Sequence, residues 1–121
     1  MDSLKFEQLV IRAIEGLPDE FRERLDNIDV VVADRPSPEQ MKTVDRKHGE
    51  LLLGLYEGVP LTQRHASYGM VIPDKITIFQ RAIESACRSE TEIVTEIRRV
   101  VLHEIAHHFG IGDDRLKELG M

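Results

Sequence analysis

The chain has 121 residues, enough for one domain with a modest core, and its hydrophobic share of 41% and charged share of 31% are typical of a globular protein. Its formal net charge of −6 disfavours nucleic acid as a partner, because phosphate binding needs a basic surface, and also disfavours stable attachment to an anionic membrane. We therefore expect a single domain over residues 1–121 with no nucleic-acid or membrane partner, while the oligomeric state stays open.

The cysteine content, the first residues and the lengths of the apolar stretches favour a location in the cytoplasm. The one cysteine, Cys87, cannot form a disulfide within the chain, and we expect it to be a small buried hydrophobic residue. The first residues, MDSLKFEQLV, lack the basic start and continuous apolar run of a signal peptide. No apolar stretch approaches the length that spans a bilayer.

The N-terminal third predicts two helices and then a strand. Apolar residues recur at helical spacing at Phe6, Leu9, Val10, Ala13, Ile14 and Leu17. Ser3 is a plausible N-cap of this helix, and Gly16 ends it. Pro18 can open a short second helix that reaches about Leu25. The β-branched run Ile28–Ala33 predicts the first strand.

The middle of the chain predicts strands separated by irregular segments. Ser37 and Gln40 form a capping box that predicts a helix over residues 38–47. Leu51 to Tyr56 and Ile76 to Gln80 are the second and third candidate strands. Between them, residues 57–75 contain two glycines and two prolines and predict a long loop, a type of segment that in a small domain is functional or mobile.

The C-terminal part predicts one long helix. Ser89 and Glu92 form a capping box that opens it, and it should run to about Phe109 with Gly110 as its left-handed C-terminal cap. Its apolar residues are Ile93, Val94, Ile97, Val101, Leu102 and Ile105. Residues 113–119 can form one last short helix. The order of helices, strands and a helix indicates an α+β fold.

The segment HEIAHHFGIGDD at residues 103–114 carries the chemistry. His103 and His107 are four residues apart, so a helix places both imidazoles on one face, within reach of one metal ion. Glu104 lies beside them and can act as a general base on a water without being a ligand. This is the pattern HExxH, which chance would produce about 0.02 times in a chain of this composition. Zinc suits two imidazoles, a third protein ligand and a water.

The third ligand has two candidates. Gly110 allows a sharp turn after the helix, and Asp113 lies six residues beyond His107. The pattern HExxHxxGxxD is similar to that of the metzincins, with aspartate in place of a third histidine. Asp113 is the predicted ligand, and its two oxygens could also cap the following helix. Two alternatives stay open: Asp113 could serve only as that cap, or Asp114 could be the ligand, because spacing alone cannot separate neighbours.

Other candidate side chains have ordinary interpretations. His108 points away from His103 toward the apolar face, and we expect it to be packed or hydrogen-bonded and not a ligand. His48 and His65 are expected on the surface, with a minor possibility that His65 joins the site. Tyr68, in the long loop, could stabilise an oxyanion.

The chain resembles the small bacterial "minimal zincin" family of metallopeptidases. The resemblance includes LLGLYEGVPLTQR at 52–64, PDKITIFQR at 73–81 and HEIAHHFGIGDDRLKELG at 103–120, of which the last is specific. It implies a small mixed β-sheet packed against the HExxH helix, with additional N-terminal helices. It also implies zinc held by His103, His107 and Asp113, with Glu104 as catalytic base. Zincins bind peptide along a strand that borders the cleft, and our candidate is Ile76 to Gln80.

Two function classes remain. The first is a zinc-dependent peptidase, a hydrolase acting on a peptide or protein substrate. The second is a zinc-binding domain without turnover that has a structural or partner-binding role. Structural zinc sites usually have four protein ligands, often cysteines, whereas this pattern leaves the fourth position open. A glutamate beside the first histidine is needed only for hydrolysis. Both features favour the peptidase.

Overall fold

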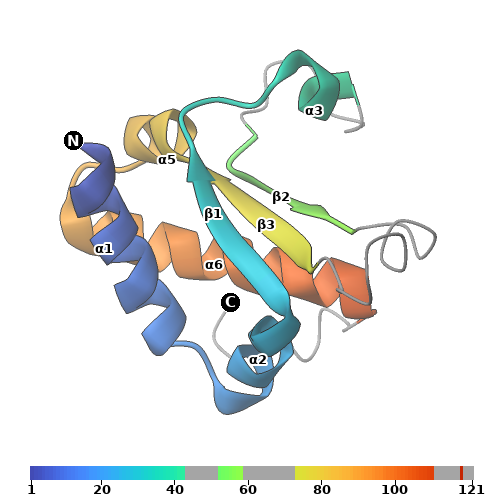
Figure 1. The fold of residues 1–121 in the computed structure, drawn as a ribbon. Helices are drawn as coiled ribbons and strands as arrows, with labels where there is room; N and C mark the ends of the chain where they lie inside the picture. The colour runs from blue at the N-terminus through green and yellow to red at the C-terminus, as the bar shows by residue number, and fades with distance from the viewer. Residues whose placement is uncertain (43–51, 59–72, 111–117, 119–121) are drawn as a thin grey trace.

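The computed structural model describes residues 1–42, 52–58, 73–110 and 118, and the statements below concern these residues. Helices pack against a three-stranded sheet (Figure 1). The elements are α1 (Ser3–Glu15), α2 (Asp19–Arg24), the 3-10 turn η1 (Leu25–Asn27), β1 (Ile28–Ala33), α3 (Pro38–Lys42), β2 (Gly54–Glu57), β3 (Asp74–Phe79), α5 (Gln80–Ala86) and α6 (Glu90–Phe109). The α+β fold expected from the sequence is confirmed.

The sheet is mixed, and its strand order is β1-β3-β2. β1 pairs with β3 in parallel, from Ile28 opposite Asp74 to Ala33 opposite Phe79. β2 pairs with β3 antiparallel, from Gly54 opposite Ile78 to Glu57 opposite Lys75. β3 is therefore the central strand, and β2 is an edge strand of the sheet that the structure describes.

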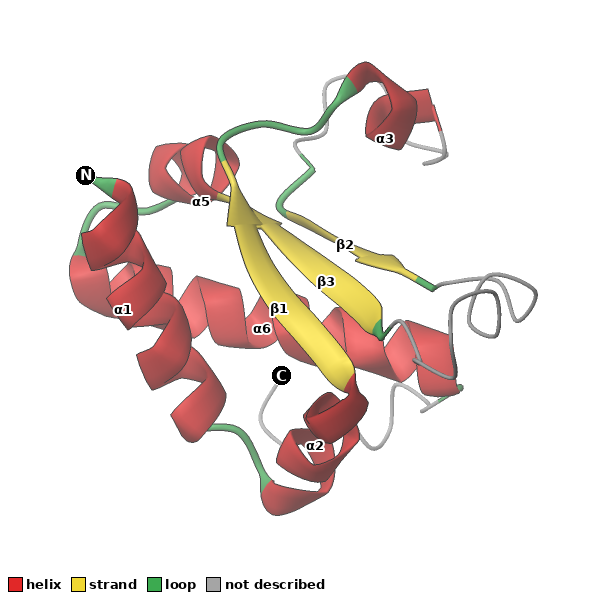
Figure 2. Ribbon diagram, viewed as in Figure 1, coloured by secondary structure: helices red, strands yellow, loops and turns green. Residues whose placement is uncertain are grey.

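The core lies between the sheet and the two longest helices, α1 and α6 (Figure 2). The sheet contributes alternating residues of β1 and β3, such as Val30 and Ile76, which are paired neighbours. Most of the predicted helix-face residues of α1 and α6 are buried: Phe6, Leu9, Val10, Ala13, Ile93, Val94, Ile97, Val101, Leu102 and Ile105. Ile14 of the same predicted face is only partly buried. Arg98 of α6 joins the two helices, since its Nε donates to the carbonyl of Ala13 at 3.2 Å.

The helix ends follow the capping chemistry of the sequence, with one correction. Ser89 Oγ accepts from the N–H of Glu92 at 3.1 Å, and Ser37 Oγ accepts from the N–H of Gln40 at 3.1 Å, which confirms both predicted caps. The predicted Ser3 cap is wrong, because Asp2 caps α1 by accepting from the N–H of Lys5 at 2.8 Å. An aspartate can make this bond as well as a serine.

The strand bounds differ slightly from those expected. β1 has the bounds predicted for the first strand, whereas β2 begins later, at Gly54, and extends to Glu57. β3 begins at Asp74, so the predicted loop 57–75 is shorter at both ends, and its residues 59–72 lie outside the described residues. Residues 43–47 of the third predicted helix and most of the segment 113–119 also lie outside the described residues.

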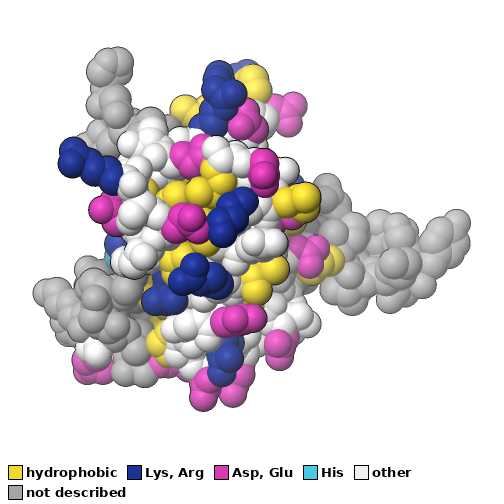
Figure 3. Space-filling model, turned by 90° about the vertical axis from the view of Figure 1, so that its left-hand side faces the viewer, with side chains coloured by type: hydrophobic (Ala, Val, Ile, Leu, Met, Phe, Trp, Pro, Cys, Tyr) yellow, Lys and Arg dark blue, Asp and Glu magenta, His cyan; other side chains and the backbone are white. Residues whose placement is uncertain are grey.

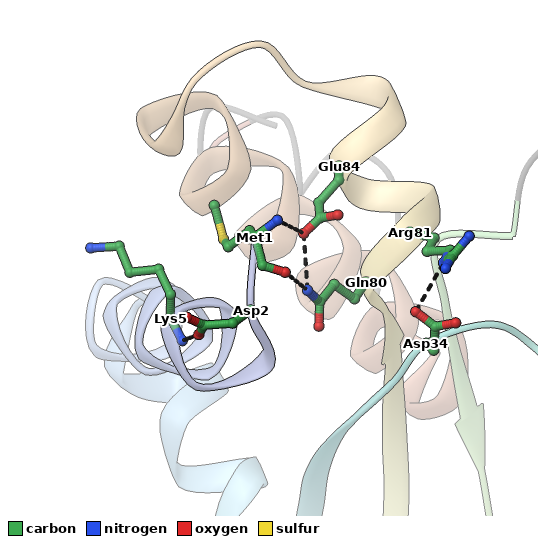
Figure 4. A network of polar contacts seen from close by, with 7 residues as sticks. All are labelled: Met1, Asp2, Lys5, Asp34, Gln80, Arg81 and Glu84. Atoms are coloured by element: carbon green, nitrogen blue, oxygen red, sulfur yellow. Dashed lines mark hydrogen bonds and ion pairs between the residues drawn. The ribbon is translucent and has the colours of Figure 1, made fainter.

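Polar contacts attach α5 to the start of α1 and to the end of β1 (Figure 4). Gln80 Nε2 donates to the carbonyl of Met1 and to Glu84 Oε1, each at 2.9 Å. Arg81 Nε donates to Asp34 Oδ1 at 3.1 Å. On the face of the molecule shown in Figure 3, acidic and basic side chains alternate around small hydrophobic areas. No surface of a single sign of charge appears in that view.

Cys87 ends α5 and packs against the core as predicted, although it is half-buried and not buried. Burial raises the pKa of its thiol, and the charges of Glu96 and Glu92 raise it further, against the opposing effect of Arg99. The thiol is therefore protonated at neutral pH, which is the state of a packing residue and not of a nucleophile.

Candidate metal centre

The last two turns of α6 carry the three residues of the HExxH pattern. The buried stripe of α6, which includes Val101 and Ile105, fixes the rotation of the helix against the sheet. His103 and Glu104 are half-buried as a result, and His107 is exposed. This end of α6 lies beside β2 (Figure 1). The helix therefore presents the three side chains at the border between the core and the solvent.

The two histidines are neighbours, as their spacing predicts. The centres of the His103 and His107 rings are 6.5 Å apart, and the ring planes make an angle of 74°. Two imidazoles bound to one zinc at a tetrahedral angle, with zinc–nitrogen distances of about 2.1 Å, have ring centres about 5 Å apart. The rings must therefore approach by about 1.5 Å, which rotation of the exposed His107 side chain can supply. The pair fits a zinc ion.

Glu104 lies in a partly buried environment beside His107. Burial raises the pKa of its carboxyl group, while a hydrogen bond from the backbone N–H of Tyr56 and the nearby His107 oppose the rise. Burial weakens the hydration of the carboxylate, and a less hydrated carboxylate is a better proton acceptor. The bond from Tyr56 also shows that the Glu104 side chain is directed toward strand β2.

The third ligand predicted from the sequence lies outside the described residues, as do Asp114, His48, His65 and Tyr68. Gly110 does have the left-handed conformation expected of it, with φ 71° and ψ 28°. Within the described part of the chain, no group of three or more histidine, cysteine, aspartate or glutamate side chains is placed to hold a metal ion. The assignment of Asp113 therefore stays a prediction.

A second group of side chains adjoins the site. The His108 ring is stacked on the Tyr56 ring, with centres 3.9 Å apart and planes at 17°, which confirms that His108 is a packed residue. It packs at the surface, however, and not in the apolar core. The Tyr56 hydroxyl donates to Asp74 Oδ2 at 2.5 Å, and His108 Nε2 lies 3.9 Å from the same oxygen. We name these three residues the Tyr56 clamp.

Sequence reasoning missed the Tyr56 clamp, although one signal was available. Residues 54 and 56 share a face of a strand by alternation, and Asp74 precedes the next predicted strand by two residues. Strand alternation alone does not reveal that α6 covers the face of β2 that carries residues 54 and 56. Gly54 permits that contact, since a Cβ there would lie 2.5 Å from Val100 Cγ1 of α6.

The strand that borders the site is not the expected one. Ile76 to Gln80 was the candidate, but β3 is paired on both sides, so it has no edge to offer a peptide, and Gln80 belongs to α5. β2 is the edge strand beside Glu104. The N–H of Phe79 donates to the carbonyl of Leu53 at 3.0 Å, so the alternation of an antiparallel ladder directs the backbone groups of Gly54 and Tyr56 away from β3.

None of the helices in the described ranges is both long and apolar enough to cross a membrane.

No protein of curated function matches the sequence. The fold is similar to that of a conserved hypothetical protein from Thermo thermophilus, with a TM-score of 0.55 and 21% identity over 90% of this chain and 94% of the other. The sequence pattern of the zincin-like metallopeptidases matches residues 25–121, a span that contains all three strands and the HExxH helix. The chain therefore belongs to the zincin-like metallopeptidase family.

Proposed function

We propose that the protein is a zinc-dependent peptidase. The observation that carries the proposal is the position of Glu104, half-buried beside the His103 and His107 pair and bonded to the edge strand β2. A purely structural zinc site does not require a carboxylate beside its histidine ligands that is not itself a ligand. Membership in the zincin-like metallopeptidase family supports the same reaction class and the same metal.

His103 and His107 hold the metal in this proposal, together with Asp113 from the segment after Gly110. When bound, zinc supplies the Lewis acidity that activates a water and polarises the peptide carbonyl. Glu104 accepts the proton of that water and delivers it to the leaving amine, as a general base that then acts as a general acid. Its partial burial reduces the hydration of the carboxylate, which makes it a better proton acceptor.

The proposed substrate is an extended segment of a peptide or protein, bound along the outer edge of β2. The backbone groups of Gly54 and the carbonyl of Tyr56 face that edge, whereas the Tyr56 N–H is bonded to Glu104, and strand addition is a common mode of peptide binding. An exposed Phe109 lies at the same end of α6, and the Arg24 guanidinium covers one side of its ring at 4.6 Å from the ring centre.

We place the reaction in the cytoplasm, in keeping with the composition of the chain.

The test starts with the metal. The untagged protein should contain about one zinc per chain, and His103→Ala should contain none, by metal analysis after dialysis. Glu104→Gln should keep its zinc, because Glu104 is not a ligand, but should lose hydrolysis of a peptide mixture by a factor of about 100 or more. Mass spectrometry of the mixture measures this loss.

The outcomes separate the two function classes. Zinc in the parent with no hydrolysis of any peptide in the mixture would favour the zinc-binding domain without turnover. Equal hydrolysis by the parent and Glu104→Gln would show that another group is the base. No zinc in either protein after zinc has been supplied would remove the basis of both functions.

A further inference from the structure

Tyr56 is the residue at which strand β2 meets the catalytic end of α6. Its backbone N–H donates to the Glu104 carboxylate. Its ring is stacked on His108, four residues further along the same helix, with ring centres 3.9 Å apart. Its hydroxyl donates at 2.5 Å to Asp74, which is 8% exposed. One residue therefore contacts two successive turns of α6 and the neighbouring strand β3.

The register of β2 against α6 explains why one residue makes all these contacts. Val100, Glu104 and His108 follow one another at four-residue spacing and form a stripe along α6. Gly54 lies against Val100, and Tyr56 lies against the next two members of the stripe. Two residues of a strand advance by about 6.6 Å and four residues of a helix by about 6 Å, so the strand and the helix stay in step.

The bond from Tyr56 to Glu104 depends on a strand with limited support. β2 has four residues and pairs with β3 on one side only within the described sheet. Short edge strands open locally at low free-energy cost, and each opening would move a backbone donor away from its acceptor. The Tyr56 clamp is a second attachment of β2, independent of the β2–β3 ladder, and it lies at the very residue whose N–H binds Glu104.

We propose that Tyr56 is a positioning residue for Glu104. The side chain of Tyr56, held by Asp74 and His108, keeps the backbone N–H of the same residue against the Glu104 carboxylate. Glu104 is thereby aimed at the edge where a substrate strand would lie. The catalytic consequence rests on the proposed peptidase function, whereas the positioning itself is a property of the protein alone and is testable without metal or substrate.

The test measures hydrogen exchange of single backbone amides by NMR. Glu104→Ala removes the acceptor and should speed exchange at the residue 56 amide by about tenfold, the effect of one hydrogen bond to a charged group. Tyr56→Phe keeps the stacked ring but removes the hydroxyl, and it should speed exchange at the same amide by about threefold or more. The amides of Leu55 and Glu57, which belong to the β2–β3 ladder, should keep their parent rates and serve as internal controls.

A merely structural role gives a different pattern. Faster exchange at residues 55, 56 and 57 together in Tyr56→Phe would mean that the clamp stabilises the whole strand, which would overturn the proposal. An unchanged residue 56 amide would overturn it as well. Asp74→Asn removes the charge that accepts from the Tyr56 hydroxyl, and it should give the same selective effect and decide the matter if Tyr56→Phe does not fold.

The catalytic consequence has its own readout. In the zinc-loaded protein acting on a fluorogenic peptide mixture, Tyr56→Phe should lower kcat severalfold and leave KM unchanged, because Glu104 does not bind the substrate. A change in KM alone would assign Tyr56 to substrate binding instead. If the parent cleaves no peptide, the proposed function fails, while the amide measurements still decide whether Tyr56 positions Glu104.

Discussion

At the scale of the residue, Gly110 determines how α6 ends. Its φ of 71° lies in the left-handed region, and among the residues that the structure describes no atom outside its chain neighbours lies within 4 Å of a Cβ built there. No contact with the described residues therefore opposes a side chain at this position, and the cost that we expect is one of backbone conformation. The chain can leave the helix here, three residues after His107, only at a residue that tolerates this conformation.

We expect Gly110→Ala to lower the free energy of unfolding by about 1 kcal/mol, since a Cβ is disfavoured in the left-handed region. Gly110→Asn should lower it less, because asparagine adopts this conformation more readily than alanine. Urea denaturation of the three proteins measures the difference. Equal stability of Gly110→Ala and the parent would mean that the helix ends in another conformation in solution.

At the scale of the element, the contact between β2 and α6 depends on Gly54. A Cβ at Gly54 would lie 2.5 Å from Val100 Cγ1 and 3.3 Å from the carbonyl oxygen of Thr77. Val100 is branched at Cβ and 7% exposed, so its side chain has little freedom to move aside. A methyl group at position 54 therefore forces the strand and the helix apart.

We expect Gly54→Ala to lower the free energy of unfolding by about 1–3 kcal/mol, the usual cost of overpacking. This cost outweighs the benefit of the smaller loss of conformational entropy that alanine suffers on folding compared with glycine. Val100→Ala removes the opposing methyl groups, so the same Gly54→Ala change should cost much less in that background. A double-mutant cycle by urea denaturation measures the coupling. Equal costs in the two backgrounds would show that the close contact is not what restricts position 54.

At the scale of the whole molecule, the proposed site combines one end of α6 with a ligand from the segment beyond Gly110. The described part of the chain provides the His103 and His107 pair, and the proposal takes the third ligand from Asp113. Zinc that binds only the folded chain stabilises it in proportion to its affinity. The thermal midpoint therefore reports on the ligand set of the intact protein.

We expect zinc at about 100 times its dissociation constant to raise the midpoint of the parent by roughly 10 °C. Asp113→Ala should lose most of this rise, and Asp114→Ala should keep it, because a removed ligand weakens zinc binding far more than a neighbouring carboxylate does. His103→Ala is the control without a site. Differential scanning calorimetry measures the midpoints. Equal rises in the midpoints of Asp113→Ala and Asp114→Ala would contradict the assignment of Asp113.

What the sequence determined by itself is local. The buried stripe of α6, its Ser89 cap and its Gly110 terminus follow from helical periodicity and from the chemistry of single residues, and the structure confirms them. The proximity of His103 and His107 is equally local, since four residues of helix place any two side chains one turn apart. The strand Ile28–Ala33 is marked by its β-branched run.

Only the tertiary structure decided which strand borders the site. β3 is central and β2 is the edge because of pairings between residues far apart in the chain, and strand alternation alone contains no information on pairing order. The Tyr56 clamp is of the same kind, since Tyr56, Asp74 and His108 meet only after β2, β3 and α6 have packed. The chemistry of the candidate site was therefore local, whereas the surroundings that position Glu104 depend on long-range contacts.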